Sequence, residues 1–251
     1  KGAMYTTQLV VVLVLCAAVA ADKITNLPGY NGTKLDMYSG FIEIGDTGRH
    51  IHYWLIEAVK NPETAPLVYW TNGGPGCSGV GGGLFEEGGP LRVDSEGKVR
   101  YTTPSWTEVA NVVFVEQPAG VGFSYFTDIF DRVTNDEKAA NDNVKFLKGF
   151  LKAFPKYVGR QTWLTGESYG GVYIPMLASY ILADPSTQIA KQLEGFMVGN
   201  PVFNCQESSE TQQASANLLY WHGLVSYTNW AKWQQNDCDT SNSGTCNRIY
   251  S

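Results

Sequence analysis

Several patterns that assign a function at once are missing from this sequence of 251 residues. It holds three histidines and no H-E-x-x-H, which argues against a zinc hydrolase. It has no G-x-x-x-x-G-K-[ST], so the glycine-rich stretch at 73–83 is not a nucleotide-binding P-loop. It has no basic run and a formal net charge of −6, which makes nucleic acid a poor partner. We therefore expect neither a metal ion nor another cofactor.

A hydrophobic run long enough to span a bilayer comfortably is missing as well. The uncharged stretch at 9–21, LVVVLVLCAAVAA, is shorter, and the small residues at its end resemble a signal-peptidase site. We take Met4 as the initiator and 1–21 as a signal peptide, with a buried strand or a membrane anchor as the alternatives. No lysine or arginine lies between Met4 and the run, which departs from the usual pattern. We expect the mature protein in the secretory pathway, in a vacuole or lysosome or outside the cell, and free of the membrane.

Cysteine is scarce: Cys77, Cys205, Cys238 and Cys246 lie outside the predicted signal peptide. An oxidising route favours disulfides, and four cysteines allow three pairings between which the sequence does not choose. The single N-x-[ST] pattern begins at Asn31, in a turn-rich stretch, and is a candidate for glycosylation.

What the sequence does have is a series of short apolar runs that end in loops of glycine, asparagine or proline. The runs that predict buried strands are 67–70, 111–116, 161–166 and 193–201. The stretch 40–57 has a glycine-rich centre between two apolar-rich runs and predicts a β-hairpin. A hydrophobic content of 43% suits a packed globular core.

Two stretches between these strands have a helical period. In 135–154 the apolar residues that recur every three or four positions are Ala140, Val144, Leu147, Leu151 and Phe154. The charged residues predicted to lie off this face are Lys138, Asp142, Lys145, Lys148 and Lys152. Thr134 and Glu137 predict a capping box at the start of this helix, and Pro155 predicts its end. The apolar stretch at 172–182 predicts a second helix.

Strands that alternate with helices predict an α/β fold, with a mostly parallel sheet and helices on both faces. Sites in such sheets form at the carboxyl ends of the strands. The loops expected to meet at one edge follow Trp70, Glu116, Thr165 and Val198. We predict an incomplete α/β core at 22–204, whose C-terminal part is missing. The helical period and polar tail of 205–251 predict the start of a helical cap insertion.

The order Gly166-Glu167-Ser168-Tyr169-Gly170 matches G-x-S-x-G, the strand–turn–helix elbow that presents a nucleophilic serine in hydrolases. In a chain with 27 glycines, an ordinary glycine-rich turn is the alternative. A predicted strand precedes the motif and a predicted helix follows it, and this context favours the elbow.

A serine nucleophile needs a base, usually a histidine that is oriented by a carboxylate. His222 is the one histidine after Ser168, and it lies in a helical stretch where a packing role is the better interpretation. We expect the base and its aspartate to lie outside this chain, and the chain alone to be inactive. The oxyanion hole should combine the N–H of Tyr169 with one from the loop TNGGPG, where Gly73 and Gly74 expose backbone donors.

Five motifs in this order, TNGGPGCSG, Glu87-Gly88-Gly89-Pro90, EQPAGVGFSY, TGESYGG and VGNP, together resemble the serine carboxypeptidase family of acid-active α/β-hydrolases. The stretch LPGYNGTKLDMYSGFIEI also resembles the mature start of that family. The resemblance runs over 27–246, roughly the first half of a typical member. It implies an α/β-hydrolase fold.

The resemblance implies roles for single residues. Ser168 would be the nucleophile, and Gly74 and Tyr169 would donate the oxyanion-hole N–H groups. Cys77 would form a disulfide with a cysteine beyond the end of this chain. The family's catalytic aspartate and histidine have no counterpart here.

By the same resemblance, Asn72 and Glu167 would bind the terminal carboxylate of a peptide, with Trp70 beside them and Glu87 as the partner of Glu167. Glu86 is a second candidate for that partner. Two close glutamates share a proton, which raises one apparent pKa, and a protonated carboxyl can donate to a substrate carboxylate. This pairing predicts an enzyme that works best in acid.

We therefore predict a serine-type carboxypeptidase that removes C-terminal residues from peptides and proteins at acidic pH, through an acyl-enzyme on Ser168. An acyltransferase with the same triad and a truncated, non-catalytic relative are the alternatives. The sequence leaves the side-chain specificity and the oligomeric state open.

Overall fold

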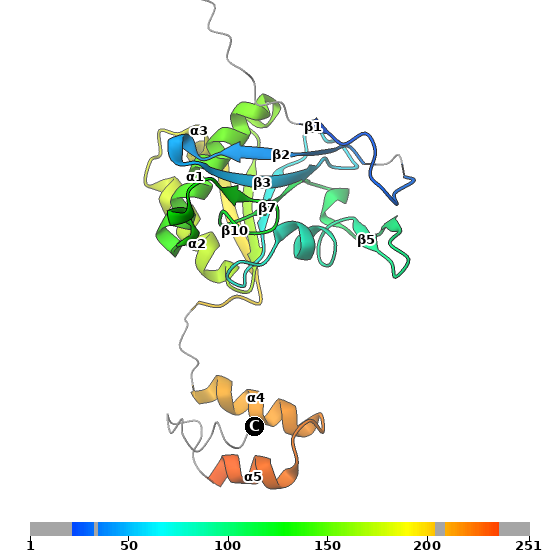
Figure 1. Ribbon diagram of the computed structural model, residues 1–251, viewed down its shortest axis with the longest axis vertical. Coiled ribbons are helices and arrows are strands. Elements are labelled where there is room, and N and C mark those ends of the chain that lie inside the picture. The colour runs from blue at the N-terminus through cyan, green and yellow to red at the C-terminus, as the bar shows by residue number, and fades with distance from the viewer. Residues whose placement is uncertain (1–21, 33–34, 204–208, 236–251) are drawn as a thin grey trace, which may run out of the picture. The chain divides into compact units, whose positions relative to one another are not determined.

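The computed structural model describes residues 22–32, 35–203 and 209–235 (Figure 1). The chain divides into two compact units, Lys1–Pro201 and Val202–Ser251. The predicted signal peptide lies outside the described residues, as do Cys205, Cys238 and Cys246.

The first unit is built on a mixed sheet that has eight strands among the described residues. They are β1 (Asp22–Lys23), β2 (Met37–Glu43), β3 (Arg49–Ile56), β4 (Leu67–Thr71), β7 (Asn111–Glu116), β8 (Tyr125–Phe126), β9 (Thr162–Glu167) and β10 (Leu193–Gly199). The order across the sheet is β1-β2-β3-β7-β4-β9-β10, and β8 pairs with β3. Strands β5 (Leu91–Val93) and β6 (Val99–Tyr101) form a separate hairpin.

The sheet confirms the predicted α/β class and its mostly parallel core. Strands β7, β4, β9 and β10 are parallel neighbours, whereas β2 and β3 form the antiparallel hairpin predicted at 40–57. The four parallel strands also coincide with the four predicted strands. Their carboxyl ends, with the loops that follow them, form one edge of the sheet, which we call the site edge.

Helices complete the first unit. They are α1 (Asp136–Ala153), α2 (Gly170–Leu182), α3 (Gln188–Gln192), the π-helix η2 (Gly79–Leu84) and the short 3₁₀ helices η1 (Gly45–Thr47), η3 (Trp106–Glu108), η4 (Ile129–Arg132) and η5 (Pro155–Tyr157). In Figure 1 α1 and α2 lie next to each other on one side of the sheet. The π-helix was not predicted, because its sequence GVGGGL has no apolar period.

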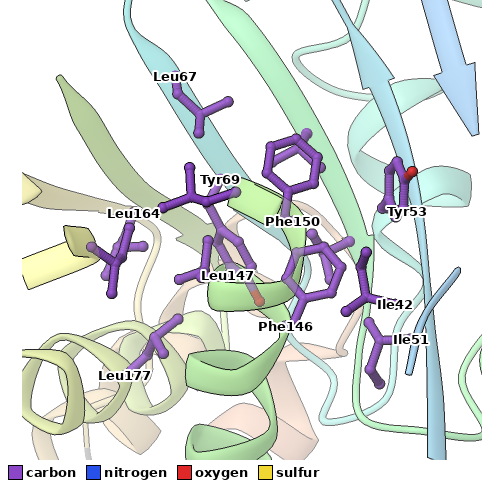
Figure 2. Close-up of a cluster of buried hydrophobic side chains, with 14 of the residues drawn as sticks. Ile42, Ile51, Tyr53, Leu67, Tyr69, Phe146, Leu147, Phe150, Leu164 and Leu177 are labelled. Atoms are coloured by element: carbon purple, nitrogen blue, oxygen red, sulfur yellow. The ribbon is translucent and has the colours of Figure 1, made fainter. Parts of the chain in front are cut away.

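Strands β4 and β7 are buried along their whole length, which explains why their sequences are mostly apolar. Along β7, Val113 and Val115 belong to the cluster that packs against α1 and α2, which we call the helix-side core. Val112 and Phe114 belong to a second cluster that includes residues of η2. Figure 2 shows the helix-side core around Phe146 of α1, whose ring is fully buried. Burying such a side chain stabilises the fold by roughly 2–3 kcal/mol.

The start of α1 corrects one prediction. The N-cap is Asn135, whose side-chain oxygen accepts a hydrogen bond from the N–H of Lys138 at 2.8 Å. Thr134 and Glu137 therefore do not form the predicted capping box. Both Thr134 and Asn135 are good capping residues, and the sequence alone did not separate them. The helix ends at Ala153, before Pro155, as predicted.

Asp142 was predicted to lie off the apolar face of α1, and its side chain is nevertheless buried. Arg49 of β3 donates two hydrogen bonds to it, at 2.7 and 2.9 Å, and a third to Asp131 at 2.7 Å. Burying a carboxylate is tolerated only when it is paired and hydrogen-bonded, and the bidentate guanidinium supplies both.

The second unit contains α4 (Ser209–Trp221) and α5 (Tyr227–Gln235), which confirms the helical period of this stretch. Tyr220 and Trp230 stack with their ring centroids 4.5 Å apart, and Trp233 is buried. Its role as a cap stays a prediction. Over the described ranges of both units, none of the helices is long and apolar enough to cross a membrane.

Candidate active site

Ser168 lies in the tight turn between β9, which ends at Glu167, and α2, which begins at Gly170. Its φ angle is +58°, a left-handed conformation that is unusual for a residue with a side chain. The turn is held by a hydrogen bond of 3.0 Å from the Ser168 N–H to the carbonyl of Gly199, at the end of β10. A strained serine between a strand and a helix is the geometry of a nucleophile elbow.

The turn after β4 lies directly against this elbow. At Gly73 a Cβ atom would lie 2.4 Å from the backbone nitrogen of Tyr169 and 2.6 Å from the carbonyl oxygen of Glu167. No larger residue fits there, so glycine is required for the two turns to meet. The next residue, Gly74, has a φ angle of +105° and lines the same cavity as Ser168. The two backbone stretches expected to form an oxyanion hole are thus neighbours.

That cavity has a volume of about 480 Å³ and gathers most of the predicted site residues. The predicted residues that line it are Asn72, Gly74, Cys77, Glu86, Glu87, Glu167 and Ser168. Ser78, Gly81 and Gly82 line it as well. They come from the segment 72–87 after β4 and from the elbow after β9, so two of the four loops expected to meet at the site edge line this cavity.

The orientation of Asn72 is fixed by its neighbours. Its side-chain oxygen accepts hydrogen bonds from Nε1 of Trp70 at 2.8 Å and from the N–H of Gly83 at 2.9 Å. Its amide nitrogen donates to Oε1 of Glu87 at 2.8 Å. Because an indole N–H and a backbone N–H can only donate, the amide oxygen must face them and the amide nitrogen must face Glu87. We call Asn72, Glu87 and Glu167 the carboxyl group cluster, because they are the residues predicted to bind the carboxyl group of a substrate.

Glu87, and not Glu86, is the glutamate bound to Asn72. Partial desolvation raises the pKa of the Glu87 carboxyl above its ordinary value. The hydrogen bond from Asn72 opposes this shift, while the nearby charges of Glu167 and Glu86 add to it. The Glu87 carboxyl therefore keeps its proton to a higher pH than an ordinary glutamate does.

Two other groups near the elbow were not singled out in the sequence. The hydroxyl of Tyr169 donates to the carboxylate of Asp136, at 3.1–3.2 Å, at the start of α1. A buried network joins Glu116 at the end of β7 to His52 and Ser78. Glu116 ends an apolar strand and Asp136 begins a helix, but which partners meet there depends on how the elements pack.

The remaining predicted residues are placed as follows. His222 lies in the second unit, where its ring nitrogen Nδ1 is 2.9 Å from the carbonyl oxygen of Leu218 in the preceding turn. Cys77 is exposed and has no disulfide partner among the described residues. Asn31 is exposed, whereas Thr33 of its sequon lies outside the described residues. A glycan on Asn31 and a disulfide of Cys77 stay predictions.

Comparison with known proteins agrees with the motifs. A family model described as serine carboxypeptidase matches residues 28–250. The chain is 39% identical to the lysosomal protective protein of Mus musculus, over 88% of this chain and 45% of that protein. It is 41% identical to serine carboxypeptidase ctsa-4.1 of Caenorhabditis elegans, over 94% of this chain and 48% of that protein. The chain thus spans about half the length of these curated relatives.

Among solved structures, the fold is similar to that of Kex1(delta)p, a prohormone-processing carboxypeptidase from Saccharomyces cerevisiae. The TM-score is 0.63 at 24% sequence identity, over 86% of this chain and 52% of that chain. This likeness supports the fold.

Proposed function

The chain belongs to the serine carboxypeptidase family, and we propose that it carries the nucleophile and the carboxylate-binding groups of a serine-type carboxypeptidase. The observation that supports this most is the one cavity that Ser168 shares with Asn72, Glu87 and Glu167. A nucleophile beside groups that recognise a free carboxylate fits cleavage of the last peptide bond of a chain. Cleavage of internal bonds would leave these groups without a partner.

In the proposed reaction, Oγ of Ser168 attacks the carbonyl carbon of the last peptide bond and gives its proton to a base. The N–H groups of Tyr169 and Gly74 stabilise the oxyanion that forms. The C–N bond then breaks, the leaving amine takes the proton from the base, and water hydrolyses the acyl-enzyme. We propose that the base and its carboxylate come from residues outside this chain, so that the chain alone is inactive.

The carboxyl group cluster gives the proposed reaction its pH dependence. A protonated Glu87–Glu167 pair holds one proton that a substrate carboxylate can accept, and Asn72 stabilises the pair through Glu87. When the pH rises through the raised pKa of Glu87, the pair becomes more negative and repels the substrate carboxylate. We propose that peptide binding is strongest in acid and weakens toward neutral pH.

The test compares three substrates with the full-length gene product: an N-blocked dipeptide acid, the corresponding dipeptide amide and an acyl-glucose donor with an alcohol acceptor. We expect the dipeptide acid to be cleaved with the highest kcat/KM, and the preference over the amide to shrink as the pH rises. In Ser168→Ala we expect a loss of about 10³-fold or more. Transfer from the acyl-glucose without peptide hydrolysis would point to an acyltransferase, and no turnover of any substrate to a non-catalytic relative.

We also propose a route through the secretory pathway, to a lysosome-like or vacuolar compartment or outside the cell. The mouse relative carries "lysosomal" in its name, which supports such a route. The natural partners would be peptides and proteins with free C-termini. The exposed Asn31 and Cys77 are available for a glycan and a disulfide in such compartments.

A further inference from the structure

Glu116 is a buried carboxylate that the proposed reaction does not use. It is the last residue of β7 and is 1% exposed. One of its oxygens accepts hydrogen bonds from His52 Nδ1 at 2.9 Å and from the N–H of Phe123 at 2.7 Å, and the other accepts from the hydroxyl of Ser78. Burial alone would raise the pKa of Glu116, but these three hydrogen bonds outweigh burial and lower it. Glu116 is therefore an ionised acceptor with both oxygens occupied.

Ser78 connects this carboxylate to the cavity. Its hydroxyl donates to Glu116 and accepts a hydrogen bond of 2.8 Å from the N–H of Gly81, which makes Ser78 the N-cap of η2. The hydroxyl has one proton, and Glu116 directs that proton away from the helix, so that a lone pair faces Gly81. The start of η2 also rests on β7 itself, because a Cβ atom at Gly79 would lie 2.3 Å from the carbonyl oxygen of Val115.

The helix that Ser78 caps carries or precedes two of the three groups that hold Asn72, the third being Trp70 of β4. Gly83, in the last turn of η2, donates to the oxygen of Asn72, and Glu87, just after η2, accepts from its nitrogen. A Cβ atom at Gly82 would lie 2.6 Å from that nitrogen. A shift of η2 would therefore move two of the three partners of Asn72 directly.

The turn that contributes to the oxyanion hole is held in a different way. The N–H of Cys77 donates to the carbonyl of Gly73 at 3.1 Å, which closes the turn on itself. Gly73 also rests against the backbone of Tyr169 and Glu167. These contacts do not involve Glu116 or Ser78.

We propose that Glu116 is a positioning residue, which acts through Ser78 to set the place of η2 and so the geometry of the carboxyl group cluster, while leaving the nucleophile and oxyanion hole in place. This inference rests on the proposed function and extends it. The recognition of the substrate carboxylate then depends on a buried residue, Glu116, at the end of the neighbouring strand β7.

The test uses the full-length gene product and two substrates, an N-blocked dipeptide acid and the corresponding amide without a free carboxylate. In Ser78→Ala we expect the KM for the acid to rise about tenfold, with kcat for the acid and kcat/KM for the amide within about twofold of wild type. Labelling of Ser168 by a fluorophosphonate should keep the wild-type rate. The matched control is Thr187→Ala, which removes another hydroxyl N-cap, that of α3. Helix α3 leads into the start of β10, at the edge of the sheet opposite to the site edge. This variant should leave the kinetics of both substrates unchanged.

Glu116→Gln tests whether Glu116 acts through Ser78. A glutamine has one accepting and one donating end, so it cannot accept from Ser78 on one side and from His52 and Phe123 on the other. We expect the same rise in KM, and no further rise in the double variant with Ser78→Ala. If Glu116→Gln does not fold, the inference is decided by Ser78→Ala alone, from the difference between its effect on the KM for the acid and its effect on kcat/KM for the amide.

Two results would overturn the inference. One is an equal loss on acid and amide in Ser78→Ala, which indicates a general loss of folded protein. The other is a double variant in which the fold rise in KM over wild type equals the product of the rises in the two single variants. In either case, wild-type cleavage of the acid leaves the proposed function standing. Wild-type protein that cleaves neither substrate overturns both the function and this inference.

Discussion

Along β7, Val113 and Val115 contact the helices, while Glu116, one residue further, is held by hydrogen bonds from three different segments. The helix-side core consists of apolar side chains that fill space against α1 and α2. The site edge consists of backbone turns that approach each other closely, with polar groups beneath them. Both regions belong to the same strands.

The difference concerns what each region tolerates. The stability of a packed apolar core depends on the volume that its side chains fill. The effect of removing one of them is measured as a change in the free energy of unfolding. The site edge depends on single atoms: a methyl group at Gly73 or a missing hydroxyl at Ser78 changes the position of a reacting or binding group. Substitutions in the first region should thus change stability, and those in the second should change kinetics.

The largest effect on stability is expected for Phe146→Ala in the helix-side core. The ring is fully buried among Tyr53, Tyr69 and Phe150, and its removal leaves a cavity. We expect the free energy of unfolding of the full-length protein to fall by about 4 kcal/mol, as measured by urea denaturation. Lys145→Ala, on the exposed side of α1, is the control and should change it by less than about 0.5 kcal/mol. A similar loss for both would remove the contrast between core and surface.

Gly73→Ala should have the largest kinetic effect. The added Cβ would meet the backbone nitrogen of Tyr169 and push the two turns apart. We expect kcat/KM for a dipeptide acid to fall about 100-fold and the unfolding midpoint to fall as well, because the added Cβ meets backbone atoms. Gly170→Ala is the matched control, because its Cβ would make only ordinary contacts, the closest at 3.6 Å. Equal loss in both variants would show that the close approach at Gly73 is not the cause.

Glu87→Gln should flatten the pH dependence of binding. The wild-type carboxyl is protonated below its raised pKa and ionised above it, so the KM for a dipeptide acid should rise as the pH increases through that pKa. We expect that rise, about tenfold in wild type between acid and neutral pH, to shrink to about twofold in the variant, which cannot ionise. Glu167→Gln removes a neighbouring charge that helps to raise the pKa of Glu87, so the rise in KM should begin at a lower pH in that variant.

The control for this pH series is Glu86→Gln, because Glu86 lines the same cavity while Glu87 is the glutamate bound to Asn72. It should keep the wild-type rise in KM. A wild-type slope in Glu87→Gln would mean that another group controls the binding of the carboxylate.

The smallest effect is expected at the start of α1. Asn135→Ala removes the N-cap hydrogen bond to the N–H of Lys138 and should cost about 1 kcal/mol of unfolding free energy. Thr134→Ala should cost less than about 0.3 kcal/mol, since Thr134 does not cap the helix. The reverse order of the two variants would restore the capping box that the sequence predicted.

Much of the fold could be predicted because its signals are local. The runs of β4 and β7, the hairpin at 40–57 and the period of α1 depend on residues that are close in the sequence. The elbow at Ser168 was predicted for the same reason, since a strand, a glycine motif and a helix follow one another directly.

The rest depends on contacts between distant segments. From the helical period alone, Asp142 resembles a solvent-exposed helix residue. Its burial depends on Arg49, which is 93 positions away in the sequence. The network of Glu116 joins residues of β3, the N-cap of η2 and the loop after β7, which no single stretch of sequence contains. The π-helix is stabilised by its packing on β7 and by its cap. The intrinsic helix propensity of its sequence GVGGGL is low and does not account for it.

The order of strands also has a consequence for how the protein is made. The fully buried β4 has β7 on one side and β9 on the other, and its register pairs Leu67 with Thr162. During synthesis at roughly 5–20 residues per second, those 95 positions take about 5–20 s. For that time the apolar strand LVYWT has an open edge, which other nascent chains can pair with. The strand that precedes the serine is thus also the one that covers the open edge of β4.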